Sequence, residues 1–187
     1  MIDFAKLEEE REKDKTTLHI VISGDKEFSP QSSLTMKVNG QDELVDGRTI
    51  FNALIERLTH KCVERGFNVV VRCGANEGVD ALAQEWCKRN GHMCKQHTPN
   101  FDKGGASAGY RNCEDMFLWI GHKPQKGCLL IWDGENKYTR YMIFCAWLQS
   151  VPCKVWNYME KRWLKPNEVE DIQMAVRQEQ AQYGRYF

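Results

Sequence analysis

Four short apolar runs divide the chain, and a polar turn follows each of them. The runs occupy residues 18–22, 68–72, 127–132 and 152–156. Unbroken runs of this length, rich in β-branched residues, are typical of strands that are buried on both faces, and the helical patterns between them favour parallel pairing. The pattern therefore predicts an α/β fold, a three-layer sandwich around a central, mostly parallel sheet.

Two segments interrupt this alternation. Residues 31–46 alternate between polar and apolar positions around Asn39-Gly40, the strongest two-residue hairpin signal, and predict a β-hairpin inserted between the first strand and its helix. Residues 100–110 are rich in glycine and alanine, which predicts a loop that ends where Arg111 opens a helix.

The two ends of the chain differ from its middle. Residues 1–17 are charged and predict an N-terminal helical arm, while residues 158–187 predict a C-terminal helix and an aromatic tail. Residues 18–157 lie between them and are predicted to form one ligand-binding domain. A chain of 187 residues is long enough to bury a core of this kind.

Composition narrows the classes of partner. Lysine plus arginine and aspartate plus glutamate both number 26, so the formal net charge is +0, which gives no reason to expect a nucleic-acid partner. Charged residues follow the first four positions directly, a pattern that does not fit a signal peptide. No apolar run approaches the roughly 18 residues of a membrane span. We expect a cytoplasmic protein with no membrane partner.

Eight cysteines raise the question of metal binding or disulfides. None forms a C-x-x-C pair, and the histidines supply no partner at zinc-finger spacing. Cys87, Cys94 and His97 form the one local cluster. We interpret the cysteines as reduced thiols that act as small hydrophobic residues, with a metal site or disulfides as the alternative, and we expect neither a metal ion nor a cofactor.

The turns after the strands carry the candidate chemistry, because ligands collect at the carboxyl ends of parallel strands. The segment from Gly74 to Gly78 joins a strand to a helix, so its backbone can approach an anion closely, although the same pattern also occurs as plain turn chemistry. Asp80 in the first turn of that helix would repel a phosphate. It either caps the helix or accepts a hydrogen bond from a sugar hydroxyl or a base.

A second constellation consists of Lys103, Arg111 and Asn112. A glycine-rich segment that delivers an Arg-Asn pair to a helix offers a bidentate anion grip and an amide donor, whereas the alternative for Arg111 is a solvated surface side chain. Asp133-Gly134 follows the longest apolar run and marks the floor of the expected pocket. Asp133 either binds a ribose or caps the following helix.

These segments resemble a known family in order and spacing. They are residues 21–24, the G-A-x-x-G-x-D-x-L-A turn over residues 74–83, the A-G-Y-R-N segment over residues 108–112, and W-D-G over residues 132–134 followed by Thr139. Together they resemble the YspA-like branch of the SLOG superfamily, which includes the LOG phosphoribohydrolases and the DNA-processing protein DprA. The resemblance implies a Rossmann-like domain that binds nucleotides or nucleotide-derived signals, and with the aromatic tail it favours a homo-oligomer.

The chain departs from the hydrolases of that superfamily. Their signature P-G-G-x-G-T-x-x-E carries a glutamate that assists cleavage of the N-glycosidic bond, but here Tyr138 replaces the glycine before Thr139, and Tyr141 and Met142 stand where the acid is needed. Lys26 also stands where an arginine is usual. These departures favour binding over turnover.

Two functions remain as hypotheses. The first is a module that binds an ADP-ribose-like or cyclic nucleotide, either as a sensor or as a sequestering decoy such as a phage-encoded anti-defence protein. The second is a nucleoside-phosphate hydrolase that uses Glu77, Asp80 or Glu135 as a non-standard acid. The residues that we expect to contact the ligand are Ser23, Gly24, Lys26, Gly74, Ala75, Asn76, Gly78, Asp80, Lys103, Arg111, Asn112, Asp133, Gly134 and Thr139.

Overall fold

The computed structural model describes residues 12–184, so most of the predicted N-terminal arm and the end of the aromatic tail lie outside the described residues. The strands are β1 (Thr17–Gly24), β2 (Ser33–Val38), β3 (Gln41–Asp46), β4 (Asn68–Gly74), β5 (Met93–His97), β6 (Lys126–Trp132), β7 (Cys153–Asn157) and β8 (Arg162–Trp163). The helices are α2 (Gly47–Glu64), α3 (Val79–Asn90), α4 (Phe101–Gly104), the 3₁₀ turn η1 (Gly105–Ser107), α5 (Ala108–Gly121), α6 (Lys137–Leu148) and α7 (Pro166–Tyr183).

The central sheet has the strand order β5-β4-β1-β6-β7-β8. The first five of these strands pair in parallel, and the two-residue strand β8 pairs antiparallel with β7. The chain therefore moves outward from β1 through β4 to β5, then returns to the other side of β1 and continues through β6 to β7. This order confirms the predicted α/β fold with a mostly parallel sheet, in a Rossmann-like arrangement.

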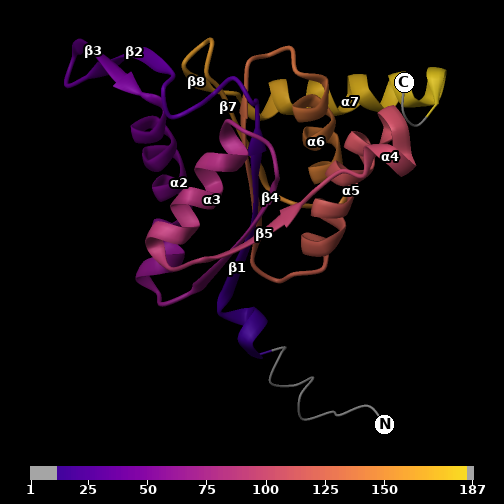
Figure 1. Cartoon of the computed structure of the whole chain (residues 1–187), viewed down its shortest axis with the longest axis horizontal. Helices are drawn as coiled ribbons and strands as arrows, with labels where there is room; N and C mark the ends of the chain where they lie inside the picture. The colour runs from indigo at the N-terminus through magenta and orange to yellow at the C-terminus, as the bar shows by residue number, and fades with distance from the viewer. Residues whose placement is uncertain (1–11, 185–187) are drawn as a thin grey trace.

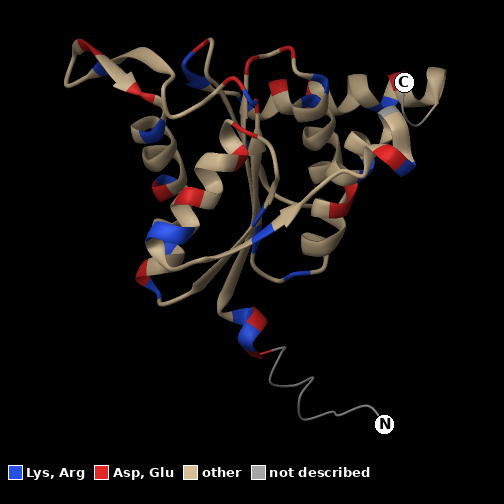
Figure 2. Ribbon diagram, viewed as in Figure 1, with Lys and Arg blue, Asp and Glu red and all other residues tan. Residues whose placement is uncertain are grey.

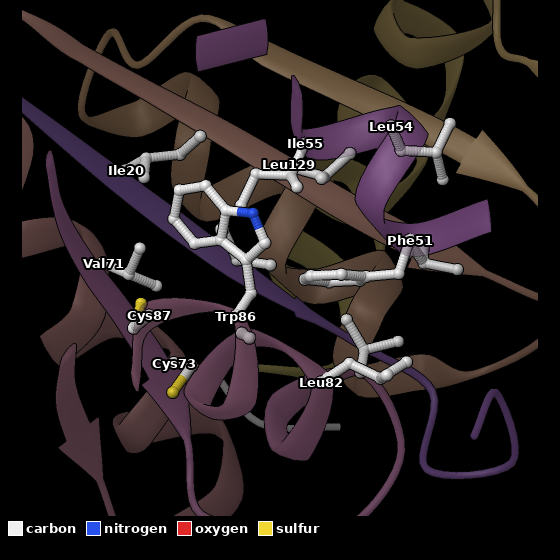
Figure 3. Close-up of a cluster of buried hydrophobic side chains, with 14 of the residues drawn as sticks. Ile20, Phe51, Leu54, Ile55, Val71, Cys73, Leu82, Trp86, Cys87 and Leu129 are labelled. Atoms are coloured by element: carbon white, nitrogen blue, oxygen red, sulfur yellow. The ribbon is translucent and has the colours of Figure 1, made fainter. Parts of the chain in front are cut away.

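Helices cover both faces of the sheet, so the fold has three layers (Figure 1). α2 and α3 cover one face, and Figure 3 shows Ile20, Val71 and Leu129 of the strands facing Phe51 and Trp86 of these helices. α5, α6 and α7 cover the other face around a second buried cluster. Figure 2 shows charged residues of both signs spread over the helices and loops, while the central strands are almost entirely uncharged. Burial of apolar surface on both faces holds the layers together.

The predicted hairpin is present. β2 and β3 pair antiparallel from Ser33 opposite Asp46 to Val38 opposite Gln41. The turn residues Asn39 and Gly40 have φ angles of 51° and 84°, and two positive φ angles match the right-handed twist of the strands. The hairpin forms a separate two-stranded sheet beside the α2 layer (Figure 1).

The predicted loop over residues 100–110 is wrong, because this segment is helical. Asn100 caps α4 by accepting a hydrogen bond from the Lys103 backbone N–H at 3.0 Å. α5 has begun by Ala108, and a Cβ on Gly109 would lie 2.6 Å from the Tyr138 ring. Gly109 therefore reflects close packing between helices, and the segment does not act as a loop that delivers Arg111.

α7 packs against α6 at the C-terminal end of the chain. Val176 of α7 is buried in the second cluster, and Arg140 of α6 makes a two-pronged ion pair with Glu179 at 2.8 and 2.7 Å. Among the described helices, none is both long enough and apolar enough to span a membrane.

Candidate functional site

A cavity of about 310 Å³ opens at the carboxyl ends of the parallel strands. It lies where the chain reverses direction across the sheet, between β1 and β6, and the turn after β4 forms its other side. A crevice at such a reversal is the usual ligand site of an open α/β sheet. The predicted contact residues that line it are Ser23, Gly24, Lys26, Gly74, Asn76, Asp80, Asn112 and Thr139.

One wall of the cavity is built around the buried carboxylate of Asp80. Ser23 Oγ donates a hydrogen bond to Asp80 Oδ1 at 2.7 Å, and the Asn76 side-chain amide donates to Asp80 Oδ2 at 3.2 Å. Gly74 leaves room for this arrangement, because a Cβ there would lie 2.2 Å from Asp80 Oδ2. The carboxylate thus joins the end of β1, the β4 turn and the start of α3.

Asp80 follows neither sequence interpretation completely. Its side chain does not point away as a simple helix cap, since it lines the cavity and is only 1% exposed. Burial raises the pKa of its carboxyl group, while the hydrogen bonds from Ser23 and Asn76 partly offset the rise. A carboxyl group in this setting can accept a hydrogen bond from a ligand when ionised and donate one when protonated.

A second buried acid, Asp25, does not line the cavity but is hydrogen-bonded to Thr139, which does. Its Oδ1 accepts a hydrogen bond from Thr139 Oγ1 at 3.0 Å, and its Oδ2 accepts one from the Asp133 backbone N–H at 2.6 Å. Burial, followed by the nearby charge of Asp133, raises the pKa of Asp25 to about 7. Asp25 therefore ties the end of β1 to the turn after β6 and to the first helical turn of α6.

The opposite wall is apolar. Met116 of α5 and Met142 of α6 lie buried at the cavity, and Phe101 and Tyr138 line it with aromatic rings. The Tyr138 ring lies over Gly109 of α5, where only glycine leaves space for it. Flat aromatic rings and polarizable methionine thioethers both suit the faces of an aromatic ligand.

A smaller hollow of about 210 Å³ adjoins the cavity, and Pro99 and Asn112 line both. Lys103 and Arg111 line this hollow and not the main cavity. Asp115 lies there as well. Asn112 donates a hydrogen bond to the His97 carbonyl oxygen at 3.1 Å, which fixes the ridge between the two spaces.

The other predicted residues lie outside the main cavity. Asp133 accepts hydrogen bonds from the backbone N–H groups of Glu135 and Asn136 at 2.7 and 2.8 Å, so it caps the turn before α6. These hydrogen bonds hold the pKa of Asp133 below its usual value, against the effect of burial. Gly78 packs under the β1 turn. The remaining ones, which do not line the main cavity, are Ala75, Glu77, Gly134 and Glu135.

Half of the residues that line the cavity were not predicted from the sequence. They are Pro99, Phe101, Gly109, Cys113, Met116, Asn136, Tyr138 and Met142. A signal existed for Asn136, whose side chain accepts hydrogen bonds from Tyr138 and Thr139 as a helix cap does, three residues before Thr139. The two methionines carried no such signal, because buried methionine is an ordinary core residue, and Phe101 stood in a segment that was predicted to be a loop.

Comparisons with family models, with curated proteins and with solved structures gave no match to this chain. Over residues 12–184, no group of three or more histidine, cysteine, aspartate or glutamate side chains is arranged to hold a metal ion.

Replacing Ser23 with alanine should lower the free energy of unfolding by about 1–3 kcal/mol, because a buried carboxylate oxygen loses its donor. The Ser23 hydroxyl is the donor to Asp80 Oδ1. Urea denaturation measures the loss, and Ser33→Ala on the exposed hairpin is the control, expected within about 0.5 kcal/mol of the parent. Equal stability of the two variants would show that the Ser23–Asp80 contact contributes little.

Proposed function

We propose that this protein binds a nucleotide or a nucleotide-derived signal, such as an ADP-ribose-like molecule or a cyclic nucleotide, in the cavity between β1 and β6. The observation that carries the proposal is one cavity with a polar wall around Asp80 and an apolar wall of methionines and aromatic rings, at the reversal point of a parallel sheet. A nucleoside has the same two-sided character, with apolar faces and hydrogen-bonding edges.

Basic residues in and beside the cavity could bind the phosphates of such a ligand. Lys26 lines the cavity, and the side chains of Lys103 and Arg111 line the adjoining hollow across the Asn112 ridge. Arginine suits phosphate because its planar group donates two parallel hydrogen bonds. A base and sugar in the cavity would therefore direct the phosphates toward Lys103 and Arg111.

We also propose that this chain belongs to the YspA-like branch of the SLOG superfamily, and the same site supports this assignment. The turn over residues 74–83 that carries the resemblance supplies Gly74, Asn76 and Asp80 to the cavity. We extend the proposal to a homo-oligomer, since Leu118 and Leu148 are 54% and 53% exposed beside each other on α5 and α6. The cytoplasmic location expected from the sequence stays part of the proposal. Light scattering of the purified protein tests the oligomeric state.

We favour holding the ligand, as a sensor or a sequestering decoy, over hydrolysing it. Glu77 and Glu135 are exposed and line no part of the cavity. Asp80 is the one acid of the three that lines it, and its raised pKa makes a hydrolase the second candidate function. Both of its oxygens already accept hydrogen bonds from the protein, which favours a positioning role.

Mass spectrometry separates these two functions. The purified protein is denatured and the released small molecules are identified, and the intact protein is then incubated with the same nucleotide. We expect the nucleotide to be recovered whole after incubation. Release of free base that stops in an Asp80→Asn variant would establish the hydrolase instead.

Replacing Arg111 with alanine should weaken the binding of a phosphorylated nucleotide by about 1.5–3 kcal/mol, the range for a hydrogen bond to a charged group. Binding of the matching nucleoside should not change, because Arg111 lines the hollow and not the main cavity. Calorimetry measures both. Arg65→Ala is the control, since Arg65 precedes β4 and so lies near the amino ends of the parallel strands, away from the cavity at their carboxyl ends. Equal nucleotide affinity of the parent and Arg111→Ala would place the phosphates elsewhere.

A further inference from the structure

Three thiols gather where α3 packs on the edge of the sheet. Cys73 lies near the end of β4, Cys87 lies on α3, and Cys94 lies on the neighbouring strand β5. Figure 3 shows Cys73 and Cys87 within the same buried cluster. The sulfur atoms of Cys73 and Cys94 are 3.5 Å apart. The strand register places Cys94 opposite Val71 and Cys73 opposite Gln96, so the two cysteines are diagonal neighbours on one face of the sheet.

The members of this cluster differ in access to solvent. Cys73 is fully buried and Cys87 is 1% exposed. Cys94 is partly exposed, because β5 is the edge strand of the sheet. A small oxidant from solvent therefore reaches Cys94 first.

They also differ in acidity. Hydrogen bonds from the thiols of Cys73 and Cys87 lower the pKa of the Cys94 thiol well below its usual value. The same hydrogen bond with Cys94, together with burial, raises the pKa of Cys73. The thiolate is the nucleophilic form of cysteine, so the accessible member of the cluster is also the reactive one.

We propose that Cys94 is a hydroperoxide-reactive thiolate and that Cys73 resolves its oxidised form into a disulfide. The Cys94 sulfur attacks one oxygen of hydrogen peroxide, the O–O bond breaks, and the hydroxide that leaves takes a proton to become water. The Cys94 sulfenic acid then accepts attack by the Cys73 sulfur, which loses its proton, and a second water leaves as the S–S bond forms. In total, two thiols lose two electrons and two protons, and one peroxide becomes two waters.

The position of this pair links it to the cavity. Cys73 directly precedes Gly74, which lines the cavity, and β5 leads through residue 97 toward Pro99, which also lines it. Forming the bond requires the two sulfur atoms to close from 3.5 Å to about 2.05 Å, which draws the end of β4 toward β5. The inference does not depend on nucleotide binding.

Peptide mapping tests the proposal directly. Cleavage after lysine and arginine places Cys73 and Cys87 in residues 73–88 and Cys94 in residues 90–95. After treatment of the folded protein with hydrogen peroxide, we expect these two peptides to be joined, the fragment spectrum to place the bond at Cys73, and dithiothreitol to separate them. Cys94→Ser should remove the joined species. In Cys73→Ala, the Cys94 sulfenic acid should persist and react with dimedone.

Three outcomes would overturn the proposal. One is a Cys94 that stays unmodified while Cys62, a partly exposed cysteine on α2, takes up oxygen. Another is a bond placed at Cys87, which would assign the resolving role to that residue. The last is a parent protein in which peroxide treatment leaves these two peptides separate. Because the fragment spectrum of the parent protein locates the bond without a variant, the test holds even if Cys73→Ala fails to fold.

Discussion

Replacing Gly78 with alanine should lower the free energy of unfolding by about 2–5 kcal/mol. Gly78 has a φ of +71° and a ψ of −127°, a backbone conformation that L residues rarely adopt and that costs them at least the ~1–2 kcal/mol of a left-handed helical residue. A Cβ there would also lie 2.4 Å from the Lys26 carbonyl oxygen and 2.5 Å from that of Asp25. Backbone atoms at the end of β1 cannot move aside as a flexible side chain does, so the overlap adds about 1–3 kcal/mol.

Gly91→Ala is the matched control for this prediction. Gly91 ends α3 with a φ of +69°, and no atom lies within 4 Å of the Cβ that alanine would add. Only the conformational cost remains, about 1–2 kcal/mol. Urea denaturation of both variants measures the difference. Equal losses would mean that α3 does not pack on the β1 turn as closely as described, and that the cavity walls are not fixed by this contact.

The contribution of Asp25 to the free energy of unfolding should fall as the pH rises from about 4 to about 7. Its pKa is raised from 3.8 to about 7, so the folded state holds the proton over a range in which the unfolded state has lost it. A raised carboxyl pKa therefore stabilises the folded state fully at low pH, and this contribution is lost by pH 7. The shift corresponds to a change on the order of 4 kcal/mol.

Asp25→Asn isolates this effect from the other titrating groups. The variant cannot ionise, so its stability relative to the parent should improve by several kcal/mol between pH 4 and pH 8. At pH 4 the variant should be about 1 kcal/mol less stable than the parent, because an amide nitrogen replaces one of the two oxygens that accept hydrogen bonds from the Asp133 N–H and from Thr139. Asp102→Asn, at an exposed carboxylate, is the control and should follow the parent. Parallel pH profiles of the parent and Asp25→Asn would show that Asp25 is ionised in the folded protein throughout.

The strands and their direction could be predicted from the sequence because burial on both faces leaves a continuous apolar run that few other structures produce. The hairpin could be predicted because Asn39-Gly40 meets the demand of a two-residue turn for two positive φ angles. Residues 100–110 could not be assigned correctly. Glycine there serves close helix packing on Tyr138, and composition alone does not distinguish that role from a loop.

The polar half of the candidate site could be predicted, because topology brings the ends of parallel strands together whatever their spacing along the chain. Ser23 lies at the end of β1, while Asn76 and Thr139 follow β4 and β6, and all three line the cavity. The separation of Arg111 into an adjoining hollow could not be predicted, since it depends on how far α5 extends toward its N-terminus. The role of Asp25 was missed because one acid after a strand gives no sign that it is buried.

The most direct test of the central claim is an NMR titration of the isotope-labelled protein with ADP-ribose, AMP, cyclic AMP and cyclic GMP. We predict that at least one of these nucleotides causes saturable shifts concentrated at the backbone amides of residues 23–26, 74–80 and 136–139, which surround the cavity. The absence of saturable shifts with all four nucleotides, or shifts centred on the amino ends of the parallel strands, would contradict the proposal that this cavity binds a nucleotide.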